Sequence, residues 1–295
     1  MRIVALKRRI VTLTALSLMT AGIMYTQTVT AQNTKEVNKT VALNADGRVS
    51  IQAFKGSIKV TGWDRAEVEI QAIIEPDGRS RSREEAVEYT EVRIDDGRGT
   101  VYIESDYDDV QRNYRDDGWD WCSDNVTLPF IHYTISIPRG ARLDISDHKS
   151  EIEVSGLQSE VRINSHKGPM VLSDITGDLR LETHKSRVRV TGLAGSLDLD
   201  THEAEVDVQF VRLGERTRIE THKGEINITI PKGAGFELDA DVGRKGELRA
   251  DFDLRDLEYR FGRRDEDLEY RGDVNGGGPL LRLRTYKGYY RIRER

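Results

Sequence analysis

The chain has 295 residues, of which 33% are charged and 7% aromatic, and its formal net charge at pH 7 is −6. This acidic balance argues against a general nucleic-acid binder, because such proteins need clustered positive charge to meet the phosphate backbone. The only cysteine, Cys122, has no partner in the chain, so no internal disulfide stabilises the fold. The apolar residues are regularly patterned, which excludes a disordered chain.

Residues 1–31 have the pattern of a secretory signal peptide. Basic residues precede an apolar stretch at 10–25, and small residues at Val29 and Ala31 fit cleavage before Gln32. The alternative is an uncleaved membrane anchor, but the stretch is short for a spanning helix of about 20 residues. We expect export to the periplasm or cell surface, with no stable membrane span after signal removal. The mature chain, 32–295, loses four positive charges and carries −10.

The first predicted strand pair lies at residues 49–60, where apolar residues alternate on both sides of an aromatic-Lys-Gly turn at Phe54. Residues 76–94 interrupt this alternation. The segment 84–88 predicts a short helix, and 91–94 predicts the strand that follows it.

Residues 105–125 form an acidic, aromatic loop that is a candidate ligand site. Aromatic platforms among carboxylates are typical of a carbohydrate site or, with enough oxygen ligands, of a calcium site. The alternative is a surface loop that folds its own aromatic side chains onto the strands. The candidate binding residues are Tyr107, Asp108, Tyr114, Trp119, Asp120 and Trp121.

A sequence repeat follows at residues 141–230, marked by histidines that are 18, 18, 18 and 20 residues apart. Apolar residues recur at five and three positions before these histidines, and at four, six and nine after them, the last being Leu157, Ile175, Leu193 and Val211. Steps of two indicate strands, so each repeat carries two short strands and two turns. The five histidines are His148, His166, His184, His202 and His222.

Strands this short cannot bury their apolar face alone, so the repeats must stack. We expect an all-β fold, a single elongated β-solenoid of stacked coils of about 18 residues with loop insertions. An antiparallel meander or sandwich is the alternative, but it has no reason to keep a constant register. The many Arg, Asp and Glu residues at 241–273 predict a charged insertion. The repeat returns at 281–292 with Tyr286 in the histidine position, so both end units are expected to close the stack.

These features together resemble the bacterial putative-adhesin family of exported β-strand-repeat domains of unknown function. The resemblance is carried by the strand pair at 49–60, the tract 133–140, the repeated His-Lys-Gly turns, the tract 228–233 and the glycine-rich closing segment 276–292. It implies a β-solenoid on an exported protein and supplies no catalytic residues.

The histidine column is a candidate metal site, and its members could also become charged together below about pH 6.5. Stacked parallel rings converge poorly on one metal ion, so a structural ladder of turn residues is the competing interpretation. The residues one position earlier, Ser165, Thr183, Thr201 and Thr221, are predicted to point inward and form hydrogen bonds. The lysines one position later could hold an anionic polysaccharide, although Glu203 interrupts them; they are Lys149, Lys167, Lys185 and Lys223.

No catalytic motif is present, so we expect a chain that is not an enzyme and needs no cofactor. The predicted function is a non-catalytic scaffold or binding module of the cell envelope. Its partner would be a polysaccharide or another envelope protein, and no nucleic acid. One alternative is a carbohydrate-active enzyme on the same scaffold. Another is a metal- or pH-responsive envelope protein that uses the histidines.

Overall fold

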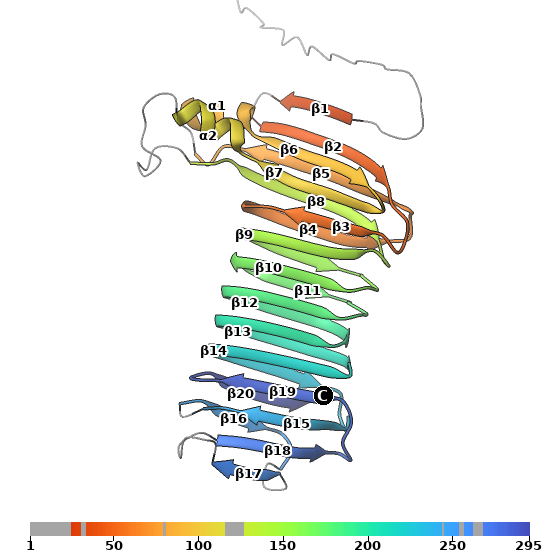
Figure 1. Ribbon diagram of the computed structural model, residues 1–295, viewed down its shortest axis with the longest axis vertical. Coiled ribbons are helices and arrows are strands. Elements are labelled where there is room, and N and C mark those ends of the chain that lie inside the picture. Colours follow the sequence, from red (N-terminus) through yellow and green to blue (C-terminus); the bar gives the residue numbers. More distant parts are fainter. Residues whose placement is uncertain are drawn as a thin grey trace, which may run out of the picture.

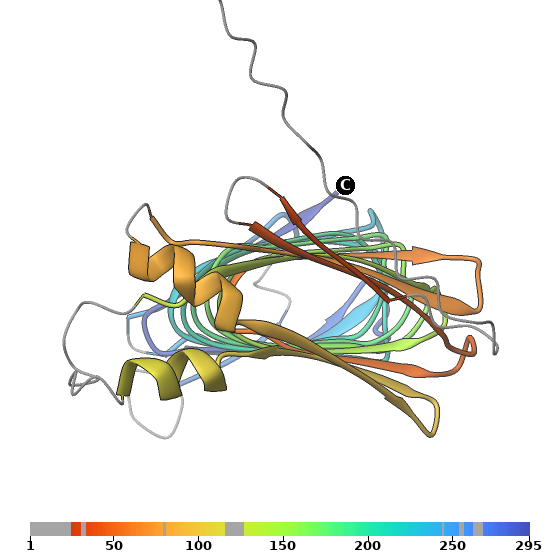
Figure 2. The same ribbon diagram turned by 90° about the horizontal axis from the view of Figure 1, so that it is seen from above.

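The computed structural model describes residues 25–30, 34–78, 81–115, 127–243, 245–253, 257–261 and 268–295. These residues form one elongated stack of strands, with two short helices near its N-terminal end (Figure 1). Seen from above, successive coils lie over one another and enclose a flattened tube with two walls (Figure 2). The prediction of an all-β solenoid is therefore confirmed.

The regular middle of the stack consists of β9 (Arg142–Ser155), β10 (Val161–Lys167), β11 (Met170–Ser173), β12 (Leu179–Gly195), β13 (Leu197–Leu213) and β14 (Arg216–Ile230). Neighbouring coils pair in parallel. Val161, for example, pairs with Leu143 in the coil before it and with Leu179 in the coil after it, each 18 residues away. The sequence repeat is thus the length of one coil.

The core fills the inside of the tube, where apolar side chains from both walls meet. The apolar positions predicted at five and three residues before the histidines, and at four and six after them, are all buried. Of the positions nine after, Leu157, Ile175 and Leu193 are buried. The prediction for Val211 is wrong, because its side chain is 64% exposed and Phe210 is buried instead. This coil has two extra residues, and the pairing of β12 with β13 shifts register beside it.

The N-terminal end is built from β2 (Thr34–Ala42), β3 (Arg48–Gln52), β4 (Lys55–Trp63), β5 (Glu67–Glu75), β6 (Glu91–Gly97), β7 (Thr100–Asp106) and β8 (Phe130–Pro138). Strands β3 and β4 form a coil that pairs in parallel with β9. On the other side of this coil lie β7, against β3, and β8, against β4. From there β6, β5 and β2 continue the sheet in antiparallel pairings.

Strand β1 (Tyr25–Thr30) pairs antiparallel with β2 and belongs to the segment predicted as a signal peptide. Residues 1–24 of that segment lie outside the described residues. The predicted helix at 84–88 is part of α1 (Arg81–Tyr89), and α2 (Asp108–Arg115) follows β7. No helix in the described ranges has the length and apolar character needed to cross a membrane.

The C-terminal end is built from β15 (Phe236–Asp241), β16 (Glu247–Ala250), β17 (Glu258–Phe261), β18 (Leu268–Val274), β19 (Leu280–Thr285) and β20 (Tyr289–Glu294). The last coil of the sequence, β19 and β20, lies between β14 and the pair β15 and β16. Strands β18 and β17 follow outside β15. The predicted charged insertion therefore contains strands. The coils of Phe54 and Tyr286 were expected to close the two ends of the stack, but further strands lie outside both of them.

The turn after each histidine is closed by small residues that lie against the neighbouring coil. Gly168 and Gly224 have φ angles of 122° and 152°, a region that disfavours residues with a side chain. A Cβ atom at Gly168 would lie 2.1 Å from the carbonyl oxygen of Ser150 in the coil before it. Glycine is therefore needed in these two coils, whereas Ser150, Ser186 and Ala204 hold the same position in the others without a positive φ.

The residues that precede the histidines are buried at the same corner, as predicted. The Ser165 hydroxyl donates a hydrogen bond of 2.8 Å to the Asp147 carboxylate, and the Thr221 hydroxyl donates one of 3.0 Å to a backbone carbonyl. The hydroxyls of Thr183 and Thr201 have no hydrogen-bond partner within the described part of the chain. The predicted hydrogen bonding thus holds for part of this column.

Leu181 is fully buried between the two walls, so its truncation leaves a cavity in the tube. We expect Leu181→Ala to lower the free energy of unfolding by about 3 kcal/mol, measured by urea denaturation. Arg189→Ala on the exposed side of the same strand is the control and should change it by less than about 0.5 kcal/mol. An equal loss of unfolding free energy in the two variants would contradict the placement of Leu181 in the core.

Gly168→Ala tests the turn that approaches the neighbouring coil. We expect a loss of about 2 kcal/mol and a lower melting temperature, because the new Cβ meets backbone and the φ angle becomes strained. Gly97→Ala is the control, since a Cβ there has nothing within 4 Å. If both variants have the melting temperature of the wild type, the turn at Gly168 tolerates a side chain and the prediction is wrong.

Candidate functional site

A ladder of stacked rings runs along one edge of the tube, at the turn between the two walls. Neighbouring ring centroids are 4.9 to 5.2 Å apart, and their planes lie within 15° of parallel. This spacing follows from the strand separation of about 4.8 Å in a sheet. The ring ladder consists of Phe54, His148, His166, His184, His202, His222 and Tyr286.

The ring ladder offers the edges of its histidine rings to solvent, because each of the five histidines is stacked between two other rings. His166 is half-buried, and the other four histidines are exposed. A gap of about 5 Å between parallel planes is the spacing of one strand to the next and leaves no room for a further ring. The outer side of Phe54 meets Tyr107, with the two centroids 6.2 Å apart. Tyr286, at the other end, is 49% exposed.

A column of lysines flanks the ring ladder, one residue further along each coil; this lysine column is Lys149, Lys167, Lys185 and Lys223, interrupted by Glu203. Glu203 lies between two of the lysines, with its carboxylate 3.7 Å from Lys185 Nζ and 3.6 Å from Lys223 Nζ. Those two charges lower the pKa of Glu203. Lys149 and Lys167 have no ion-pair partner among the described residues. The column is therefore most positive at its N-terminal end.

The surroundings of His166 oppose the protonation of its ring. Partial shielding from water lowers the pKa of His166, and the positive charge of Lys167 and of the neighbouring rings His148 and His184 lowers it further. The rings thus interact electrostatically along the column. An anion placed beside His166 would instead raise its pKa.

The geometry of the ring ladder does not favour a metal ion. Zinc requires ligands that converge at about 2.0 to 2.1 Å, whereas these rings lie side by side with parallel planes. Within the described ranges, no group of three or more His, Cys, Asp or Glu side chains is placed to hold a metal ion. The predicted role of the five histidines as metal ligands stays a prediction.

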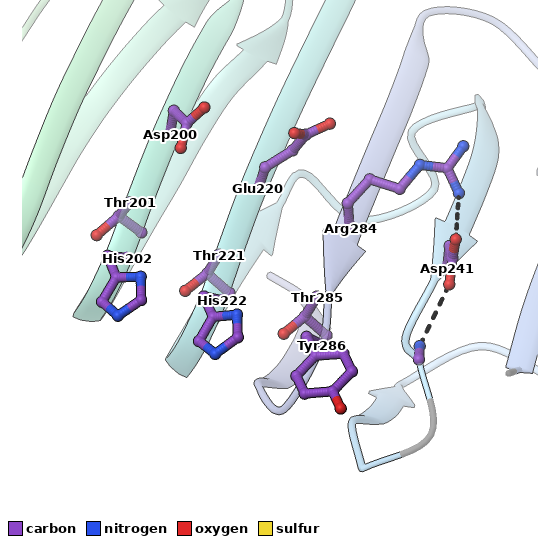
Figure 3. A pocket seen from close by; sticks show the side chains of 11 residues that line it. Asp200, Thr201, His202, Glu220, Thr221, His222, Asp241, Arg284, Thr285 and Tyr286 are labelled. Atoms are coloured by element: carbon purple, nitrogen blue, oxygen red, sulfur yellow. Dashed lines mark hydrogen bonds and ion pairs between the residues drawn. The ribbon is translucent and has the colours of Figure 1, made fainter.

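A groove of about 480 Å³ lies beside the C-terminal end of the ring ladder (Figure 3). Its walls include His202, His222 and Tyr286, together with the carboxylates of Asp200 and Glu220. Figure 3 also shows Arg284 reaching across to Asp241, to which it makes an ion pair of 3.2 Å. This half of the edge is therefore acidic, in contrast to the N-terminal half.

The structure describes only part of the acidic, aromatic loop predicted as a ligand site. Tyr107 packs in the core, and its hydroxyl donates a hydrogen bond of 3.2 Å to the Pro129 carbonyl. Burial raises the pKa of Tyr107. Asp108 is exposed at the start of α2, and Tyr114 lies in the same helix. The remaining candidates, Trp119, Asp120 and Trp121, lie outside the described residues, as does Cys122.

A Ser-His-Glu hydrogen-bond chain is present that the sequence analysis missed. Ser57 Oγ lies 2.8 Å from His132 Nδ1, and His132 Nε2 lies 3.1 Å from the Glu75 carboxylate. Such a chain can activate a serine nucleophile, but acyl transfer also needs donors for an oxyanion. Strand β4 is paired on both sides, so its backbone amides are engaged in the sheet. We interpret this chain as cross-strand bonding that orders the surface.

Comparison with solved structures finds similar proteins of low sequence identity. A putative cell adhesion protein from Clostridium sporogenes is 12% identical, with 89% of this chain and 100% of that chain covered and a TM-score of 0.38. A putative adhesin from Bacteroides fragilis is 12% identical, with 88% and 97% covered and a TM-score of 0.29. A putative lipid binding protein from Parabacteroides distasonis is 10% identical, with 87% and 96% covered and a TM-score of 0.35.

No curated protein matches the chain. The sequence does match the family described as Toastrack DUF4097 over residues 23–258, which is most of its length. The predicted membership of a β-repeat family of unknown function is confirmed by this match. The chain belongs to the Toastrack DUF4097 family.

Proposed function

We propose that the chain is an exported, non-catalytic binding module of the cell envelope that holds an extended ligand along its ring ladder. The observation that carries this proposal is the unbroken column of seven rings on one edge of the tube. A ligand that follows this edge meets the same side chains once per coil. A polysaccharide or an extended segment of another envelope protein has the matching linear form.

The scaffold supports this role because it is already ordered before a ligand arrives. The rings stand on strands that are hydrogen-bonded on both sides and packed on a closed core. A preformed site saves the entropy that a flexible loop would lose on binding. Side chains on such a site contribute affinity through repetition, since several weak contacts form at once.

Removing two rings from the ladder should reduce ligand binding without unfolding the protein. We expect the wild-type chain to gain thermal stability with at least one member of a panel of neutral and acidic polysaccharides and envelope peptides. The variant His166→Ala with His184→Ala should lose this shift and remain folded, with its own melting temperature lowered by about 10 °C at most, because it removes three stacked pairs that contribute about 1 kcal/mol each.

The matched control is Val171→Ala with Arg189→Ala, which changes exposed residues of the same two coils away from the ring ladder. This control should keep the full ligand-induced shift. A shift that survives in the ring variant would place the binding surface elsewhere on the molecule and contradict the proposal.

Export can be tested through the N-terminus of the mature protein. We expect N-terminal sequencing of the chain purified from a secreting host to begin at Gln32, so that β1 is removed and the β2 edge is freed. A chain recovered with residues 1–31 intact would contradict the predicted cleavage. The same experiment on Ala31→Phe should give an uncleaved precursor, because the residue before the cleavage site must be small.

A further inference from the structure

We propose that the N-terminal half of the ring ladder binds an acidic polysaccharide, a sugar polymer with a carboxylate on each unit, and binds it more tightly as the pH falls. The site lies on two consecutive coils and consists of the side chains of His148, His166, Lys149 and Lys167, with the ring of His184 stacked on that of His166. This inference rests on the proposed function, because it takes the same edge of the tube as the binding surface.

The charge distribution restricts an anionic ligand to this half of the edge. On the flank opposite the lysine column, the first two coils carry the neutral residues Ser146 and Asn164, whereas the next three coils carry Glu182, Asp200 and Glu220. On the lysine side, Glu203 pairs with both Lys185 and Lys223, which leaves one net positive charge on those three coils. An anion therefore finds unpaired positive charge and no facing carboxylate only at the first coils.

The orientation of the rings selects the kind of polyanion. Single-stranded nucleic acids bind by stacking their bases on open aromatic faces. In the ring ladder those faces are covered by the next ring, and only the ring edges with their nitrogen atoms are exposed. Ring edges and ammonium groups donate hydrogen bonds to carboxylates, and they repeat about every 5 Å along the stack. A linear chain of carboxylated sugars fits these donors better than a chain that must stack bases.

Protonation of the histidines couples the affinity of the site to pH. The charged groups around the three rings are the lysine column, Asp147 buried beneath the first ring, Glu182 on the flank of the third, and Glu203 beyond the third. In the free protein the lysines and the neighbouring rings oppose protonation, so the pKa of His166 is below its ordinary value. A bound carboxylate offsets that repulsion, so the complex holds more protons than the free protein. Affinity must then rise as the pH falls through the histidine pKa values.

The test measures binding of polygalacturonate by isothermal titration calorimetry at about pH 5.5 and about pH 8, on either side of the histidine pKa. Fully methyl-esterified pectin is the neutral probe with the same backbone, and poly(dT) is the nucleic-acid probe. We expect the Kd for polygalacturonate to be at least about tenfold lower at the acidic pH, with binding weakened by added salt and no binding of the neutral probe.

Variants separate the contributions of the rings and the lysines. His148→Gln with His166→Gln should abolish the tenfold pH effect, whereas His202→Gln with His222→Gln, on the acidic half of the same ladder, should keep it. Lys149→Gln with Lys167→Gln should weaken binding at both pH values. Glu203→Gln should strengthen it severalfold, because it releases Lys185 and Lys223.

Three results would overturn the inference: equal affinity at the two pH values, poly(dT) binding as tightly as polygalacturonate, or a pH effect that survives in His148→Gln with His166→Gln. Binding of the neutral pectin that is lost in the ring variant would overturn this inference and leave the proposed function standing. If no probe of any charge requires the ring ladder, both fail.

Discussion

Parallel pairing in one constant register is the constraint on which the rest of this structure depends. Once Val161 is held between Leu143 and Leu179, every position of a coil lies over its equivalent in the next. Apolar positions then merge into a continuous core, and small residues meet at the corners. The histidines become a ladder for the same reason. The candidate binding edge is thus a product of the backbone hydrogen bonds that stabilise the fold.

The repeat alone was sufficient to predict the coil length, the parallel stack, the buried positions and the corner residues. It also placed Phe54 and Tyr286 in the histidine position, where they extend the column of rings. The repeat did not predict which residue is buried near Val211, whose side chain is exposed. A coil with two extra residues can accommodate them at several points, and only packing against the neighbouring coil decides that Phe210 turns inward.

Features that join distant parts of the chain could not be predicted. The repeat places residues 281–292 in the stack, but it does not indicate that β19 pairs directly with β14, from which β15 to β18 separate it along the chain. The hydrogen-bond chain of Ser57, His132 and Glu75 likewise draws its members from three strands. Each residue is unremarkable in its own segment. The candidate site at Trp119 to Trp121 lies outside the described residues, so its role stays a prediction.

The position of the final coil has a consequence for how the molecule is assembled. Because β19 and β20 lie between β14 and the pair β15 and β16, the stack has a vacancy in its interior until the C-terminal residues arrive. A chain that folds while it is synthesised, N-terminus first, would hold two open strand edges facing each other during that interval. Open strand edges recruit other chains. Loss of β19 and β20 would therefore promote intermolecular pairing.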